Sequence, residues 1–161
     1  MPNWCFNTVT FSGDEESLNA LNIALADAKK AEKEENQAQK IHSLGDVVEG
    51  YFFDIYYERL ENEIYFQYET RWSPNIEDLA LLCKEYKVSA EHEYSESGMQ
   101  IYGTATYDAS GEYTDEQIEQ EFLDLIEYND ESGTYLYNNE YWDCEMEIID
   151  FEYQNWKEKN L

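Results

Sequence analysis

The stretch EIYFQYETRWSPNIEDLALLCKEYKVSAEHEY, residues 63–94, decides the fold. It opens with residues 63–70, an aromatic-rich segment typical of a strand, and closes with residues 88–94, VSAEHEY, which we also interpret as a strand. Between them, Ser73 is a predicted helix N-cap and Pro74 a first helical residue, where proline loses no hydrogen bond. The apolar face of this helix comprises Ile76, Leu79, Cys83 and Tyr86. The sequence therefore predicts strand, helix, strand.

The N-terminal segment repeats the pattern of a strand followed by a helix. Residues 4–11, WCFNTVTF, alternate and have one strongly apolar side. Ser12 and Glu15 form a capping-box signature for a following helix. The run AKKAEKEENQAQK, residues 28–40, keeps helix propensity without large apolar side chains, which favours a frayed helical extension over a mobile insert. The buried stripe expected on the first helix is Leu18, Leu21, Leu25 and Ala28.

Two more predicted strands complete the pattern. Residues 51–58 and 63–70 form a hairpin through residues 59–62, and residues 99–107 follow the strand at 88–94. The order is strand, helix, strand, strand, helix, strand, with one strand added. This order predicts an α+β fold, a ferredoxin-like split βαβ sandwich with an antiparallel sheet and helices on one face.

The C-terminal region predicts an acidic helix and hairpin extension. Thr114 and Gln117 form a second capping box, and extended segments are expected near residues 134–138 and 145–153 around a turn at Asn138–Asn139. The buried stripe expected on this third helix is Ile118, Phe122, Leu125 and Ile126. We predict a single domain, residues 1–161, with a ferredoxin-like core at 1–112 and the acidic extension at 113–161 packed on it.

Composition limits the classes of function. The 161 residues include 37 Asp and Glu against 10 Lys and Arg, a formal charge of −27. This charge excludes unaided binding to DNA, RNA or anionic lipid, because that binding needs basic groups that neutralise phosphates. Aromatic residues form 16% of the chain, which argues against disorder. The N-terminus has no basic region and no apolar run, so we expect a cytoplasmic protein of a bacterial host.

Three short motifs resemble a known family. They are Asn3-Trp4-Cys5 with Asn7, then Trp72-Ser73-Pro74, then Gly98 ahead of a strand that contains Gly103. Their order and positions resemble the YubB-type ferredoxin-like domain proteins carried by phages and conjugative plasmids, over residues 1–25 and 63–112. The resemblance implies a ferredoxin-like fold and a mobile-element origin, but no activity. One departure is SLGDVVEGYFFD, residues 43–54, where family members often carry a Trp-Gly-Thr-Lys-Trp-like segment.

The acidic residues are concentrated toward the C-terminus. Residues 88–156 contain 19 Asp and Glu and no Lys or Arg, whereas residues 1–87 contain 17 acids and 8 bases. Like charges on a helix destabilise it, so this arrangement invites a functional explanation. The candidate partner-binding residues are Glu116, Glu119, Glu121, Asp124, Glu127, Asp130, Glu131, Tyr141, Trp142 and Asp143.

We interpret these residues as a surface for a basic host protein, in which aromatic side chains anchor and carboxylates steer. A rigid array of carboxylates resembles the phosphates of duplex DNA, and host restriction and CRISPR effectors hold nucleic acid in basic grooves. The hypothesis is a non-catalytic inhibitor of counter-defence (anti-CRISPR or anti-restriction), a monomer or small homo-oligomer. The alternatives are a structural or assembly module, and an acidity that only maintains solubility.

No catalytic residue, cofactor or metal is predicted. The sequence contains no phosphate-binding loop, dinucleotide fingerprint, nucleophile elbow or zinc-ligand spacing. His42 is expected in a loop and His92 on the solvated side of a strand, while Cys5 and Cys83 are expected to be buried thiols. The calcium-loop spacing at residues 108–119 fails, because Tyr113 stands where the loop requires glycine.

Overall fold

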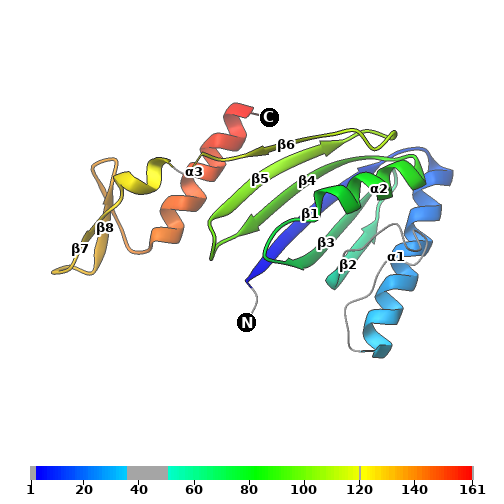
Figure 1. Cartoon of the computed structure of the whole chain (residues 1–161), viewed down its shortest axis with the longest axis horizontal. Helices are drawn as coiled ribbons and strands as arrows, with labels where there is room; N and C mark the ends of the chain where they lie inside the picture. The colour runs from blue at the N-terminus through cyan, green and yellow to red at the C-terminus, as the bar shows by residue number, and fades with distance from the viewer. Residues whose placement is uncertain (1–2, 36–50, 120, 161) are drawn as a thin grey trace. The chain divides into compact units, whose positions relative to one another are not determined.

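The computed structural model describes residues 3–35, 51–119 and 121–160. The chain forms two compact units, the first ending at Glu116 and the second beginning at Gln117. The first unit contains a six-stranded sheet and two helices, and the second contains a three-stranded sheet, a 3-10 helix and a third α-helix (Figure 1). Among the helices of these ranges, none combines the length and apolar character that crossing a bilayer requires.

The first unit has the predicted ferredoxin-like α+β architecture. Its sheet has the order β2-β3-β1-β4-β5-β6, and each pairing from β2 to β5 is antiparallel. The predicted order of elements is confirmed, and β5 is the added strand of the prediction. A sixth strand, β6, which the sequence did not predict, lies at the edge. The elements are β1 (Trp4–Ser12), α1 (Glu15–Glu35), β2 (Phe53–Arg59), β3 (Glu63–Arg71), α2 (Ile76–Tyr86), β4 (Ser89–Glu96), β5 (Ile101–Tyr107) and β6 (Tyr113–Gln117).

Both helices of this unit lie on one face of its sheet (Figure 1). The predicted stripe of α1 is buried, since Leu18, Leu21, Leu25 and Ala28 are at most 1% exposed. On α2, Leu79 and Cys83 are fully buried, while Ile76 and Tyr86 pack against the core from its margin. These side chains meet the alternating apolar residues of the strands, Val9, Phe11, Ile64 and Phe66 among them. Burial of this apolar surface is what joins helices to sheet.

Both helices begin two residues later than the sequence motifs predict. On α1 the cap is Asp14 and not Ser12, because Asp14 Oδ1 accepts the Ser17 N–H at 2.8 Å. This hydrogen bond is the main reason that the pKa of Asp14 lies below its usual value. The backbone before α2 is held elsewhere: Trp72 N–H donates to Asn3 O at 2.8 Å.

The side chain that precedes α2 does not cap it. Asn75 Oδ1 accepts the Tyr68 hydroxyl at 2.6 Å and makes no cap hydrogen bond to the helix. Thr70 Oγ1 donates to Ser73 O at 2.7 Å, which fixes the residues before the helix against β3. The helix start predicted at Ser73 and Pro74 is therefore wrong, because the residues before α2 are hydrogen-bonded to the strands and the helix begins after them.

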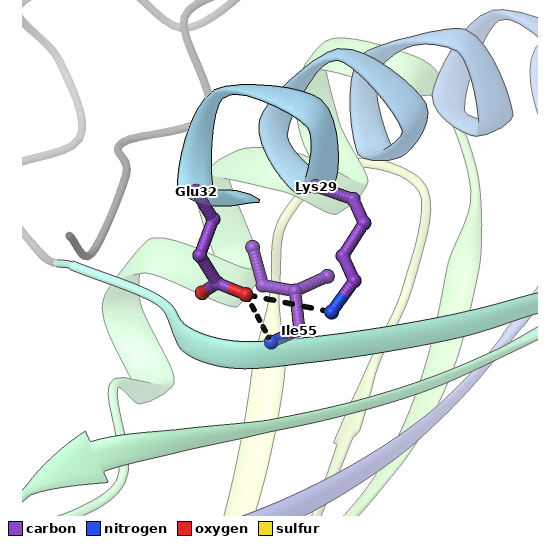
Figure 2. A network of polar contacts seen from close by, with 3 residues as sticks. All are labelled: Lys29, Glu32 and Ile55. Atoms are coloured by element: carbon purple, nitrogen blue, oxygen red, sulfur yellow. Dashed lines mark hydrogen bonds and ion pairs between the residues drawn. The ribbon is translucent and has the colours of Figure 1, made fainter. Parts of the chain in front are cut away.

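A β-bulge in β2 connects α1 to the sheet. The register shifts between Phe53 and Tyr56, and Asp54 within the shift has a φ of 50°. In Figure 2, Glu32 of α1 reaches β2, and its Oε1 accepts the Ile55 N–H at 3.0 Å and pairs with Lys29 Nζ at 3.5 Å. The bulge leaves a strand N–H without a ladder partner, and the carboxylate satisfies it. The helical extension thus continues through Glu35, and residues 36–40 lie outside the described residues.

The second unit differs from the sequence prediction in two of its elements. Its elements are a 3-10 helix η2 (Glu121–Leu125), β7 (Glu127–Asn129), β8 (Thr134–Tyr137), β9 (Glu140–Trp142) and α3 (Glu145–Asn160). The three strands pair in the order β7-β8-β9. The predicted turn at Asn138–Asn139 is confirmed, since both residues have positive φ, as tight hairpins require.

The predicted third helix, which begins at Thr114, is wrong. Residues 113–117 form β6, where Thr114 Oγ1 lies 2.6 Å from Thr106 Oγ1 of β5. The expected stripe is not buried throughout, because Leu125 is 66% exposed. A helix through this segment would set like charges one turn apart, and strand pairing avoids that repulsion.

The predicted strand at residues 145–153 is also wrong, because this segment belongs to α3. Ile148 and Ile149 are both buried, and neighbouring residues of an amphipathic strand point to opposite faces. Acids occupy the first turn of α3, and Lys157 and Lys159 occupy the last, which suits the helix dipole.

Replacing Glu32 tests the connection between α1 and the bulge. Glu32→Ala leaves the Ile55 N–H without a partner, and we expect the free energy of unfolding in urea to fall by about 1–3 kcal/mol. Glu32→Gln keeps an acceptor oxygen and should lose less. The control Lys29→Ala removes only the partly exposed ion pair, worth less than about 1 kcal/mol. An equal loss in the Lys29 variant would contradict the role of the N–H bond.

Candidate functional site

The carboxylates predicted to bind a partner are exposed, although their scaffold differs from the prediction. Glu116 lies on β6 of the first unit, and the other seven lie in the second unit, on η2, β7 and the connecting segments. None of those seven is within ion-pairing distance of a basic side chain in the part of the chain that the structure describes. The seven are Glu119, Glu121, Asp124, Glu127, Asp130, Glu131 and Asp143.

Two of these acids are held at the tip of the β7–β8 hairpin. Asn129 Oδ1 accepts the N–H groups of Glu131 and Ser132 at 3.0 and 3.2 Å, and Asn129 O accepts the Gly133 N–H at 2.8 Å. The turn requires a positive φ at Gly133, which is 69°. The hydrogen-bonded turn gives Asp130 and Glu131 a fixed backbone, which a flexible loop would not provide.

The two predicted aromatic anchors point to opposite faces of the small sheet. Tyr141 is 69% exposed, whereas the ring of Trp142 lies 5.4 Å from Phe151 of α3. Trp142 Nε1–H also donates to Tyr137 O at 3.4 Å, and the buried Tyr137 hydroxyl donates to Glu152 Oε1 at 2.9 Å. Trp142 therefore joins the sheet to α3, and Tyr141 is the residue of this pair that a partner can reach.

A buried polar network lies in the first unit and includes His92, which the sequence analysis placed in solvent. This prediction is wrong, since His92 is 2% exposed. Its Nδ1 lies 2.9 Å from the Tyr107 hydroxyl, and its Nε2 lies 2.9 Å from Asn7 Oδ1. Asn7 Nδ2 in turn donates to Cys5 O and Thr70 Oγ1, both at 3.0 Å. The network spans β1, β3, β4 and β5.

The network assigns one tautomer to His92. Asn7 Oδ1 can only accept, so His92 Nε2 carries the proton and donates it, and Nδ1 accepts from Tyr107. Burial lowers the pKa of His92 to about 3, so the ring is neutral. Both ring nitrogens are engaged by protein groups, an arrangement that suits a structural role better than proton transfer to a ligand.

The motif residues of the resemblance converge at the ends of β1, β3 and β4. Glu96 is 1% exposed, and its carboxylate accepts the N–H groups of Gly98 and Met99 at 2.8 and 2.6 Å. A Cβ on Gly98 would lie 2.8 Å from Asn3 Cγ, and one on Gly103 would lie 2.6 Å from Glu116 O. The Asn3 side chain beside Gly98 and the Glu116 backbone beside Gly103 therefore leave little room for a larger residue at either position.

An open groove of about 550 Å³ lies beside the start of α2. It is lined by the α2 residues Ile76, Glu77 and Asp78, by Pro74 and Asn75 before them, and by Tyr113 and Asp115 of β6. Asp115 accepts a short hydrogen bond from the Tyr94 hydroxyl. The groove offers carboxylates and a tyrosine ring, which attract cations, and it contains neither a thiol nor a histidine.

Within residues 3–35, 51–119 and 121–160, no group of three or more His, Cys, Asp or Glu side chains could hold a metal ion. Asp108, from the failed calcium loop, accepts hydrogen bonds from Ser110 and Glu112 within its own turn. Burial raises the pKa of Cys5 and of Cys83 to about 12, so both thiols stay protonated at neutral pH. His42 lies outside the described residues.

The structure also shows an aromatic face that the sequence analysis missed. It lies on the side of the sheet opposite α1 and α2, where Phe6 is 56% exposed and Tyr56 is 52% exposed. Sequence alternation contained the signal, because Trp4 and Phe6 alternate with the buried residues of β1. We call this set the sheet-face aromatics: Trp4 and Phe6 of β1, Phe53 and Tyr56 of β2, and Tyr65 of β3.

The neutral state of His92 makes stability depend on pH. Its pKa of about 3 in the fold lies below the ordinary histidine value of 6.5, so the unfolded chain binds a proton that the folded chain does not. The contribution of His92 to the free energy of unfolding is fully present above about pH 6.5. It decreases as the pH falls toward 3, by up to about 1.4 kcal/mol per pH unit.

We therefore expect the unfolding free energy of the protein to fall from pH 6.5 to pH 4.5 more steeply than that of His92→Gln, which cannot titrate at this position. Urea denaturation at several pH values measures both slopes. Identical slopes would show that His92 is not held neutral by burial.

Comparison with family models matches residues 52–152, more than half of the chain, to the ferredoxin-like domain of Api92-like proteins. The match covers β2 to β6 of the first unit and most of the second unit. Neither the curated proteins nor the solved structures contain a match to this chain. The split βαβ sheet agrees with the family's description, and the chain belongs to the family of ferredoxin-like domains found in Api92-like proteins.

Proposed function

We propose that this chain is a non-catalytic protein that binds and inhibits a basic partner protein through the carboxylates of its second unit. The observation that carries the proposal is the set of exposed acids from Glu119 to Asp143, which have no ion-pair partner among the described residues. Carboxylates without a cation gain the most when a partner supplies one. From Gln117 onward the sequence contains thirteen Asp and Glu and two Lys.

The partner is proposed to be a nucleic-acid-binding defence protein of a bacterial host. The resemblance of the N-terminal and middle motifs to YubB-type proteins supports an origin in a phage or plasmid, where such inhibitors are useful. A protein that holds nucleic acid presents a groove of Lys and Arg, which suits an acidic surface. The carboxylates lie on strands, a 3-10 helix and turns, and not along one α-helix. The proposal therefore requires that their negative charge complement the positive charge of the partner, but not that they reproduce the spacing of DNA phosphates.

Charge reversal of the second unit tests the proposal. Glu119→Lys, Asp124→Lys and Glu127→Lys together should abolish capture of basic proteins from a bacterial lysate and abolish competition with duplex DNA for the captured protein. Because the Debye length shrinks from about 10 Å at 0.1 M salt to about 3 Å at 1 M, the wild-type complex should dissociate within that range. A salt gradient on immobilised protein measures this.

The matched control makes the same change in net charge on the first unit. Glu61, Glu85 and Glu112 are exposed there, and their replacement by Lys should leave capture and competition unchanged. Equal loss in both variants would show that net charge alone binds the partner. A stable oligomer that persists at 1 M salt and in both variants would favour the structural or assembly module instead.

A further inference from the structure

An acidic residue, Glu69, lies among the sheet-face aromatics. Glu69 of β3 stands opposite Phe6 of β1 on one side and opposite Phe53 of β2 on the other. Side chains directly opposite in antiparallel strands have Cβ atoms about 4.5–5.5 Å apart, so the Glu69 side chain stands between those of Phe6 and Phe53. Burial, and then the charge of Asp54, raises the pKa of Glu69. A cation beside Glu69 would offset both effects, because it stabilises the charged form of the carboxylate.

The same face already contains one cation on a ring. The Arg71 guanidinium carbon lies 4.9 Å from the centre of the Phe53 ring, which also meets Trp4 edge-on at 5.0 Å. The rings of Tyr56 and Tyr65 lie 6.4 Å apart. Four of the five rings are therefore paired before any partner arrives, and Phe53 shows how a guanidinium lies on such a ring.

The charge of this face selects its ligand. Exposed rings on a sheet of this kind can stack nucleic-acid bases, but phosphates would meet carboxylates here. Within strands β1 to β4, the face carries one basic side chain, Arg71. The strand register places five acids on it, Glu58, Glu63, Glu69, Glu91 and Glu93, and Asp54 lies near them in the bulge of β2. An exposed apolar patch rimmed by carboxylates fits a segment that is both cationic and able to stack.

We propose that the sheet face formed by Phe6, Phe53, Tyr56 and Glu69 binds an arginine-bearing segment of the partner protein. Guanidinium groups stack on the exposed rings of Phe6 and Tyr56, and one of them pairs with the Glu69 carboxylate. Arginine fits better than lysine because its planar guanidinium is weakly hydrated and stacks on aromatic rings, and can bond a carboxylate through two N–H groups. The inference rests on the proposed function only in requiring a basic partner, and it uses a different surface.

The test is calorimetric titration of the full chain, in 0.15 M salt, with a capped octapeptide of alternating arginine and glycine and with its lysine counterpart. We expect the arginine peptide to bind at least about fivefold more tightly. Phe6→Ala and Glu69→Gln should each remove this preference. Phe6 is half exposed and Glu69→Gln conserves shape, so both variants should fold, which circular dichroism checks.

Matched controls separate this face from general acidity. Tyr141→Ala removes an exposed ring of the second unit, and Glu61→Gln removes an exposed charge in the β2–β3 turn. Both should retain the arginine preference, as should the triple Lys variant of the second unit. If partner capture proves insensitive to that triple variant while the preference persists, the proposed function fails and this inference stands.

Three results would overturn the inference. Equal affinity for the two peptides in wild type would mean that the chain attracts cations without recognising arginine. Binding of oligouridine that is lost in Phe6→Ala would assign the face to RNA. A dimer in sedimentation that Phe6→Ala dissociates would assign it to a second copy of the chain.

Discussion

The hydrogen bonds of Asn7 inside the sheet are the constraint on which the first unit depends. Asn7 lies on β1, between β3 and β4. Its side-chain amide donates a hydrogen bond to Thr70 on one side and accepts one from His92 on the other. A buried polar group without a partner costs about 1–3 kcal/mol, so these side chains require one another. If one strand slipped by one residue against its neighbour, its member of the network would point to the opposite face of the sheet and lose its partners. The network therefore helps to fix the register of the strands. That register also places Glu69 between Phe6 and Phe53.

Apolar periodicity predicts the first unit because its helices bury residues at every third or fourth position. The leucines of α1 follow that rule and are all buried, and the capping signature errs by only two residues. The rule fails in the second unit for physical reasons. Leu125 fits a helical stripe, yet like charges disfavour the helix and Leu125 is exposed. In α3 the decisive signals are the adjacent buried residues Ile148 and Ile149 and the acids and lysines at opposite ends.

The sequence predicts which acids are exposed but not which residues share a surface. His92 stands between two glutamates, and these acids suggested solvent, although alternation along β4 places it with the buried Ala90 and Tyr94. Tyr141 and Trp142 are neighbours in β9, and only the register and the contact of Trp142 with α3 show that they point apart. The sheet-face aromatics come from three strands, so they form one set only after β2, β3 and β1 have paired. Pairing of distant strands is the step that local patterns do not encode.

Exposed acids and exposed rings contribute differently to the proposed recognition. Surface carboxylates in water interact weakly with one another, and their field reaches about 8 Å at physiological ionic strength, so they attract any cationic protein and accelerate encounter. Attraction of this kind is not selective. Selectivity requires a contact that one cation makes better than another, and the rings beside Glu69 provide one, because stacking favours guanidinium over ammonium. Contacts made after encounter act mainly on dissociation, so a partner rich in lysine should arrive as fast as one rich in arginine and leave sooner.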